Sequence, residues 1–530
     1  MRLSSVTRRD FLKVASITSI ATLGISRQGK LPPWFSTSEP LNSPMRSPLK
    51  SVNMDYPNVL LIIFDALSAR NMALYGYPRQ NTPNIENFAA RSIVYHQHHS
   101  SGNFTSPGTG SLLTGVYPWY HRALQQRTQT LERYGNRNIF SLFPKNYFRF
   151  SYTQNPFTYS LLDLFRDDIQ LLPRISDLAE YNALFTEDYL QQDYFIATEA
   201  EVLSLKQETH QPASLFLSML EKLRIGRDNR ALAQEFRKTY PMGLTNCRAT
   251  NPGVQCFELE KAIDWSISQV KSTTQPFFGY LHYFPPHSPY NPRADFMPLF
   301  KEELALPKKP PFPGATGTNP KAMRNHRRRY DQSIAHVDSE FGRLISSLKQ
   351  AGILDNTVVI FTSDHGEMFE RNVLGHGTPS LYEPIMHIPL LLSLPGQQSR
   401  LDVNAPTNNV DMLPTILSLV GVEHPADDEG IVLPLSDPTS LSFDRSIYTV
   451  EAKSSPKRGP LNKATFALLH WPFKLIQYQG YGNILDGYEL YNLFDDPEEM
   501  ADQYSPDDPT SRQMKQELQE KLVEVKAVPT

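Results

Sequence analysis

The sequence predicts an α/β protein with a large buried core, and three observations support this prediction. Two wholly apolar runs, Asn58–Phe64 and Val358–Phe361, are typical of strands that are buried on both faces. Segments with helical spacing alternate with runs of this kind as far as about residue 425. From about residue 426 the pattern changes to short strand-like runs and a polar helix, which predicts a small antiparallel sheet with one helix.

The chain has 530 residues, of which 40% are hydrophobic, and this is enough for two domains. We expect a signal and linker over residues 1–56, a main α/β domain over 57–425 and a C-terminal subdomain over 426–530. Residues from about 157 to 250 show no α/β rhythm, and we expect them to form a mostly helical insertion or lid.

The individual elements follow from hydrophobic spacing and from turn residues. In the main domain we expect helices over Asn81–Arg91, Glu258–Lys271, Tyr330–Gly352 and Val410–Val420, and further strands over Ser92–His99, Tyr147–Thr153, Pro276–His282 and Ile388–Leu394. In the C-terminal subdomain we expect strands over Ser446–Val450, Thr465–Leu469, Phe473–Gln477 and Tyr488–Leu493, and a helix over Ser511–Val525. The basic cluster Arg324–Arg329 is expected to be a solvated helix start, with contact to an anionic ligand as the alternative.

The N-terminus indicates export. Arg8-Arg9 is followed by Phe11-Leu12 and by the short apolar run Val14–Ile25, which is the pattern of a twin-arginine signal. The run is too short to span a bilayer comfortably, and no clear cleavage site follows it. We therefore expect a periplasmic or extracytoplasmic protein that uses the twin-arginine export machinery, with the signal either cleaved or kept as an anchor. The net charge of −3 predicts no nucleic-acid partner.

Cys247 and Cys256 are the two cysteines of the chain, and they lie close together in a polar segment. In an exported protein this spacing favours a local disulfide bridge. Two unrelated free thiols are the alternative.

Polar residues that can bind a metal follow both of the buried strands named first. Asp65 ends the run Asn58–Phe64, and Asp364 with His365 follows the run that ends at Phe361. Ligands bind open α/β sheets at the carboxyl ends of the strands, so we expect these side chains to share one site. Carboxylates beside an imidazole can hold a divalent cation. The alternative for a single Asp-His pair is a helix cap beside a surface histidine.

A polar loop, Asn103–Gly115, lies between these strands in the sequence and runs into a short helix. It offers the hydroxyl groups of Thr105, Ser106 and Thr109 next to a helix N-terminus, which attracts anions.

Eight motifs carry a resemblance to a known family, over roughly residues 57–500. They are, in chain order, PNVLLIIFDAL at 57–67, SLLTG at 111–115, PHSPY at 286–290, YDQSIAHVDSEFGRLI at 330–345, TVVIFTSDHGE at 357–367, GHGTPSLYEP at 375–384, VDMLPTILSLVG at 410–421 and ELYNLFDDPEE at 489–499. In this order they resemble the sulfatase branch of the alkaline phosphatase superfamily. The resemblance implies a mixed sheet between layers of helices and a small C-terminal sheet domain.

The chain departs from the family pattern at the nucleophile. Sulfatases of this family carry a Cys or Ser that is oxidised to formylglycine, followed by a Pro and an Arg. Here Thr105 stands at that position, before Pro107, and Thr109 stands at the arginine position. Threonine does not yield the formylglycine aldehyde, and the paired Asp of the first strand end is reduced to Asp65-Ala66. This pattern is similar to lipoteichoic acid synthases and phosphoethanolamine transferases, which use threonine directly.

The resemblance assigns roles to the candidate site. Asp65, Thr105, Asp364 and His365 would bind the metal, with Thr105 as the nucleophile. His287 and His376 would contact the ester oxygens and protonate the leaving group, and Asn103 would be a further donor to the anion. Three alternatives are Ser106 as the nucleophile, a metal pair of His96 and His98 on one strand face, and plain packing roles for His287 and His376.

These residues predict a metal-dependent hydrolase or transferase that cleaves phosphate or sulfate esters through Thr105. The substrate would be an anionic ester of a glycan, a lipid or a small molecule. One cation is expected, and its oxygen-rich ligand set suits Mn²⁺, Ca²⁺ or Mg²⁺, with Zn²⁺ as a further option. Two alternative functions are a sulfuric ester hydrolase that works without formylglycine, and an inactive binder of anionic glycans or lipids.

Overall fold

The structure is a computed structural model that describes residues 56–126, 129–182, 231, 234–246, 255–315, 317, 319–482 and 485–528. The predicted export signal, the linker before Tyr56 and most of the predicted insertion lie outside these residues. Among the described helices, none combines the length and the apolar character that crossing a membrane requires.

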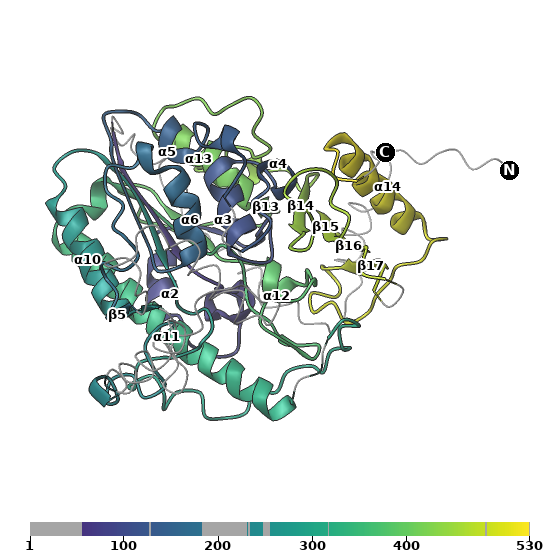
Figure 1. Cartoon of the computed structure of the whole chain (residues 1–530), viewed down its shortest axis with the longest axis horizontal. Coiled ribbons are helices and arrows are strands. Elements are labelled where there is room, and N and C mark those ends of the chain that lie inside the picture. Colours follow the sequence, from purple (N-terminus) through teal and green to yellow (C-terminus); the bar gives the residue numbers. More distant parts are fainter. Residues whose placement is uncertain are drawn as a thin grey trace, which may run out of the picture.

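A seven-stranded mixed sheet forms the centre of the protein (Figure 1). Its strands are β1 (Asn58–Phe64), β2 (Ile93–Tyr95), β4 (Phe148–Thr153), β7 (Phe277–Tyr283), β8 (Thr357–Thr362), β11 (Leu390–Ser393) and β12 (Leu401–Val403). They lie in the order β12-β2-β11-β8-β1-β7-β4. The four strands from β8 to β4 are parallel, whereas β11 runs antiparallel to both of its neighbours. The predicted class, an α/β fold with a mixed sheet between helices, is confirmed.

Strand β1 is apolar at every position because both of its faces are covered. Leu60, Ile62 and Phe64 pack into a core with helices on one side of the sheet, and Leu61 and Ile63 pack into a second core on the other side. The first core also contains residues of helices α2 (Pro83–Ala89), α10 (Leu259–Ser272) and α11 (Pro320–Gln350). The second core contains residues of helices α3 (Thr105–Thr114), α5 (Ile139–Leu142), α6 (Pro156–Leu164) and α13 (Met412–Leu419).

A separate antiparallel sheet follows, with the order β14-β15-β16-β17. Its strands are β14 (Ser446–Glu451), β15 (Ala464–His470), β16 (Phe473–Gln479) and β17 (Gly487–Asn492), and helix α14 (Pro509–Glu524) packs against it. Tyr117 and Trp119 of the main domain share a hydrophobic core with Phe466 of β15 and Leu518 of α14. The C-terminal sheet is therefore fixed to the main domain by burial of apolar surface.

Some predicted elements have different bounds in the structure. The predicted strand Ser92–His99 is two strands, because only β2 joins the main sheet, whereas β3 (His98–His99) pairs with β13 (Thr407–Asn408). Helix α11 begins at Pro320, so the basic cluster Arg324–Arg329 lies inside the helix and does not precede it. The apolar stripe marks only the part of α11 that packs on the core, which is why the sequence pattern missed its first turns.

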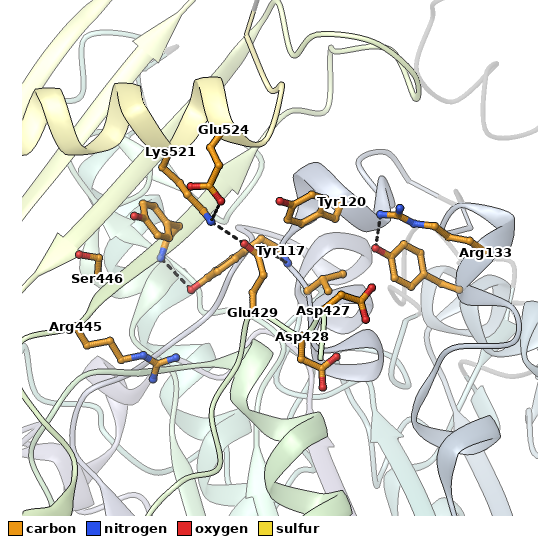
Figure 2. A pocket seen from close by; sticks show the side chains of 13 residues that line it. Tyr117, Tyr120, Arg133, Asp427, Asp428, Glu429, Arg445, Ser446, Lys521 and Glu524 are labelled. Carbon is orange, nitrogen blue, oxygen red and sulfur yellow. Dashed lines mark hydrogen bonds and ion pairs between the residues drawn. The ribbon is translucent and has the colours of Figure 1, made fainter. Parts of the chain in front are cut away.

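A polar cavity of about 590 Å³ lies where α14 meets the main domain (Figure 2). At its edge, Glu429 accepts hydrogen bonds from the backbone N–H of Tyr117 (3.1 Å) and the indole N–H of Trp119 (3.2 Å). The ammonium group of Lys521 lies 3.1 Å from Glu429 and 3.1 Å from Glu524. The charged groups drawn in Figure 2 thus join the two parts of the protein.

This contact gives a testable prediction about stability. Glu429→Ala leaves an indole N–H and a backbone N–H without their acceptor in a half-buried interface and removes one of the two carboxylates beside Lys521. It should lower the free energy of unfolding by about 1–3 kcal/mol. Thermal or urea unfolding measures the change. Glu524→Ala is the control, because the Glu524 side chain is 65% exposed and its loss should change the stability by about 0.5 kcal/mol or less. Equal losses in both variants would contradict the prediction.

Candidate active site

Four buried polar side chains meet at the carboxyl ends of three neighbouring parallel strands. Asp65 follows β1, His282 lies near the end of β7, and Asp364 and His365 follow β8. All four side chains are fully buried. The Nε2 atom of His282 lies 3.6 Å from Asp65 Oδ2 and 3.7 Å from Asp364 Oδ2. The predicted meeting of Asp65, Asp364 and His365 is therefore present in the structure, and His282 joins them.

Several atoms of this cluster lack a hydrogen-bond partner within the described residues. They are Asp65 Oδ1, Asp364 Oδ2, His282 Nε2 and His365 Nε2. His365 Nε2 lies 3.3 Å from Asp65 Oδ1 and 3.8 Å from Asp364 Oδ2. Buried polar atoms without partners are costly, and a cation between them would supply each with a ligand bond. One atom each from Asp65, His282 and Asp364 lie within 4.8 Å of one another, which fits a metal site.

The Nδ1 atoms of His365 and His282 each form a hydrogen bond with a group outside the cluster. His365 Nδ1 lies 2.9 Å from the carbonyl oxygen of Gly366, and His282 Nδ1 lies 2.7 Å from the hydroxyl oxygen of Thr158. A carbonyl only accepts, so His365 donates from Nδ1 and, when neutral, has its lone pair on Nε2. This is the tautomer that a metal ligand requires.

The electrostatics of the cluster show an excess of buried negative charge. Burial and the neighbouring Asp65 raise the pKa of Asp364, since two carboxylates compete for one site. Burial would also raise the pKa of Asp65, but His287, His365 and His282 outweigh it and hold that pKa below its ordinary value. Burial lowers the pKa of His365, and the two carboxylates overcome this and raise it to about 9. The cluster therefore attracts positive charge.

Thr105 lies beside this cluster at the first position of helix α3. Its Oγ1 atom accepts a hydrogen bond of 3.1 Å from Asn155 Nδ2, which also donates to Asp65 Oδ2. The Oδ1 atom of Asn155 caps helix α6 by accepting from the backbone N–H of Phe157 (2.7 Å), which fixes the direction of its amide group. One asparagine therefore ties the hydroxyl group of Thr105 to the carboxylate of Asp65.

Helix α3 can approach the cluster because of a glycine. A Cβ atom on Gly108 would lie 2.2 Å from the carbonyl oxygen of Asp364, so no other residue fits there without displacing the backbone. This close contact places the N-terminal part of α3 beside the cluster.

Two more histidines complete the surroundings of the cluster. The ring of His376 lies 4.2 Å from that of His365 and 5.0 Å from that of His287, measured between centroids. Glu367 binds His376 Nδ1 (2.8 Å) through one oxygen and accepts from the hydroxyl group of Tyr290 (3.0 Å) through the other. Burial raises the pKa of Glu367 to about 7, and burial with the nearby His365 holds the pKa of His376 well below its usual value.

The remaining candidates have other surroundings. Asn103 donates one Nδ2 hydrogen to the carbonyl oxygen of Thr378 (2.8 Å), and its Oδ1 atom has no hydrogen-bond partner among the described residues. Ser106 Oγ has no hydrogen-bond partner among the described residues, whereas Thr105 is tied into the cluster. His96 binds Asp402 (2.6 Å) through Nε2 and His98 binds Thr407 (2.9 Å) through Nδ1, and the alternative metal pair of these two histidines stays a prediction. Cys247 lies outside the described residues, and the disulfide bridge to Cys256 stays a prediction.

Sequence reasoning missed four residues of this site. His282 and Asn155 stand at or just after strand ends, and the rule that selected Asp65 could have found both. Glu367 ends the motif at 357–367, but nothing in the sequence indicates that it binds His376. Lys453 comes from the C-terminal sheet, and its Nζ atom lies 4.3 Å from the Phe104 ring centroid and 3.5 Å from the carbonyl oxygen of His376. Only the folded chain brings it there.

Relatives of known name match the chain over part of their length. Arylsulfatase K of Bos taurus is 26% identical over 280 residues, which cover 46% of this chain and 50% of that protein. Endo-4-O-sulfatase of Bacteroides thetaiotaomicron is 27% identical over 405 residues, which cover 69% of this chain and 70% of that protein. The chain thus spans about half the length of the arylsulfatase K relative.

Solved structures share the fold. A phosphonate monoester hydrolase from Silicibacter pomeroyi superposes with a TM-score of 0.59 at 21% identity, covering 88% of this chain and 95% of that chain. A structure in complex with its substrate D-glucosamine-2-N,6-O-disulfate superposes with a TM-score of 0.64 at 16% identity, covering 89% of this chain and 98% of that chain. At these identities the likeness concerns the fold alone.

Two family models match the sequence directly. The model described as "N-sulphoglucosamine sulphohydrolase, C-terminal" matches residues 378–528. The model described as "Sulfatase" matches residues 57–422, which is more than half of the chain. The chain therefore belongs to the sulfatase family.

Proposed function

We propose that this protein hydrolyses sulfate esters, with Thr105 as the nucleophile and one divalent cation beside it. The observation that carries the proposal is the group of unpartnered, buried ligand atoms of Asp65, Asp364, His282 and His365 next to the hydroxyl group of Thr105. The names of the relatives, arylsulfatase K and endo-4-O-sulfatase, support sulfate esters as the substrate class. Thr105 would complete the ligand set.

The reaction would proceed in two balanced steps. The hydroxyl oxygen of Thr105 attacks the sulfur atom, the bond between sulfur and the ester oxygen breaks, and the alcohol leaves with the threonine proton. Water then attacks the sulfur atom of the sulfated threonine, which releases hydrogen sulfate and restores the hydroxyl group. A cation bound by these residues would acidify the hydroxyl group and neutralise charge on the ester.

The chain's own residues would orient these steps. Asn155 holds the hydroxyl group of Thr105, and the N-terminus of α3 stabilises negative charge on the sulfate group. His287 and His376, whose ring centroids lie 5.0 Å apart, would contact the ester oxygens and the leaving group, and Glu367 fixes the ring of His376. Asn103 donates one Nδ2 hydrogen to Thr378 and would offer the second hydrogen to the anion.

A phosphate ester is the second candidate substrate, and the presence of a threonine at position 105 favours it. The resemblance to lipoteichoic acid synthases and phosphoethanolamine transferases rests on Thr105, and such enzymes imply phosphoryl chemistry. A panel of aryl sulfates and of aryl phosphate mono- and diesters, with and without added Mn²⁺, separates the two. Turnover of phosphate esters alone would reject the sulfatase proposal, and turnover of neither class would favour a binding protein.

We also propose export through the twin-arginine route, which rests on Arg8-Arg9 and Phe11-Leu12. Replacing both arginines with lysine should leave the protein in the cytoplasm, as measured by cell fractionation. Normal export of this variant would reject the proposal.

Substitution of Thr105 tests the nucleophile. Thr105→Ala should lower turnover by about three orders of magnitude or more, because the first covalent step is lost, whereas Thr105→Ser should retain measurable activity. Ser106→Ala is the matched control, since Ser106 is the next residue and is equally buried, and its effect should be mild. An inactive Ser106→Ala variant beside an active Thr105→Ala variant would assign the nucleophile to Ser106.

Metal analysis of the purified protein tests the ligand set. We expect about one divalent cation per chain, loss of turnover on chelation, and loss of the bound metal in both Asp364→Ala and His282→Ala, because each removes a ligand that no neighbour replaces. Asp402→Ala is the control, since this carboxylate is 44% exposed and binds His96 far from the cluster. Two cations per chain, or full metal retention in His282→Ala, would contradict this ligand set.

A further inference from the structure

A groove of about 790 Å³ with strong positive charge lies outside the proposed active site. Its walls are the loop 301–311, the first turns of α11 and the turn between β9 (Phe369–Glu370) and β10 (Val373–Leu374). Nine lysine and arginine side chains and three glutamates line this basic groove, which gives it a net charge of +6. The whole chain has a net charge of −3, so the positive charge is concentrated here.

Part of this charge has no counterpart in the groove. Lys309 is neutralised by Glu370 (2.9 Å) and Glu498 (2.7 Å). Lys301, Lys308 and Lys321, by contrast, are exposed and form no ion pair with any carboxylate of the described residues. Like charges so close together repel one another, and a ligand that carries several negative charges would relieve this repulsion.

The groove wall also contains buried donors without an acceptor. Arg371 is 5% exposed, and its Nε atom has no hydrogen-bond partner among the described residues; the same holds for Nε of Arg327. Arg371 stands in the left-handed region with a φ of 53°, and its guanidinium group lies 4.1 Å from the ring centroid of Tyr382. Its guanidinium group also donates to the carbonyl oxygens of Pro310 and Glu499, so this positive charge is fixed in the wall of the groove.

We propose that the basic groove binds a sulfated polysaccharide chain at a second position, apart from the centre that cleaves the ester. The volume is larger than a single sulfate group needs, and several separate cations line it, so the ligand carries more than one anionic group. The choice of a sulfated glycan among polyanions rests on the proposed function.

The groove and the proposed active site are linked by one hairpin. Arg371 and Asn372 form its turn in the groove wall, while Glu367 and His376 at its base lie in the site. Arg371 stands four positions after Glu367, which corresponds to a span of at most about 13 Å. The groove and the proposed active site thus lie at the two ends of one short hairpin.

Equilibrium binding of chondroitin sulfate tests the proposal. The probes are a sulfated disaccharide and a long fragment of the same polymer, titrated into the full chain carrying Thr105→Ala so that neither probe is consumed. Lys301→Gln, Lys308→Gln and Lys321→Gln are combined in one variant, and Lys145→Gln, Lys271→Gln and Lys349→Gln form the matched control, because all six lysines are exposed.

The groove variant should bind the long fragment about tenfold more weakly, and binding of the disaccharide should stay unchanged. The control variant should bind both probes as the parent does. Equal weakening in the control variant would overturn the proposal. So would binding of unsulfated hyaluronan, or of duplex DNA, as tightly as the long fragment and with the same loss in the groove variant.

The aryl sulfate assay separates this proposal from the proposed function. With Thr105 intact, the groove variant should cleave a small aryl sulfate as fast as the parent, because no substituted lysine belongs to the proposed active site. The parent could cleave no aryl sulfate and still bind the long fragment in a way that depends on the groove lysines. This result would support the binding groove and reject the proposed sulfatase reaction.

Discussion

Two carboxylates buried side by side are the constraint on which the rest of the site depends. The parallel register that pairs Ile63 of β1 with Thr362 of β8 places Asp65 and Asp364 at the same edge of the sheet. Burial makes charge on both expensive, and the raised pKa of Asp364 reflects this conflict. Their surroundings therefore supply either positive charge or hydrogen bonds, and the atoms left without either mark the place for a cation.

The neighbouring loops hold this edge rigidly. Ser363 donates from its hydroxyl group to the carbonyl oxygen of Phe64 (2.7 Å) and accepts from the backbone N–H of Leu67 (2.9 Å), so the two strand ends are tied together. Gly108 lets α3 reach the backbone of Asp364. The position of Thr105 thus follows from contacts made elsewhere, and a threonine can be placed with the accuracy that nucleophilic attack requires.

Periodicity predicted the elements whose burial pattern is regular. β1 matches its predicted bounds because it is apolar on both faces, and α10 matches to within a residue. Residues that act through distant partners gave no local signal: Asn155 is 90 residues from Asp65 along the chain, and Lys453 reaches the site from another sheet. The types of the candidate metal ligands were predictable because the strand ends converge. Their number was not, because it depends on which side chains point into the cluster.

His282 changes which cation the candidate site would favour. The family's second aspartate is replaced here by Ala66, which adopts a φ of 60° and donates its backbone N–H to Asp364 Oδ1 (3.2 Å). At this position, therefore, a backbone N–H orients the carboxylate of Asp364, and the side chain of Ala66 supplies no carboxylate of its own. With His282 beside His365, the cluster presents two imidazoles to two carboxylates, in place of the oxygen-rich set that the sequence alone predicts. Imidazole suits Zn²⁺ better than Ca²⁺, so the loss of one carboxylate and the gain of His282 would both move the preference of a metal site away from calcium.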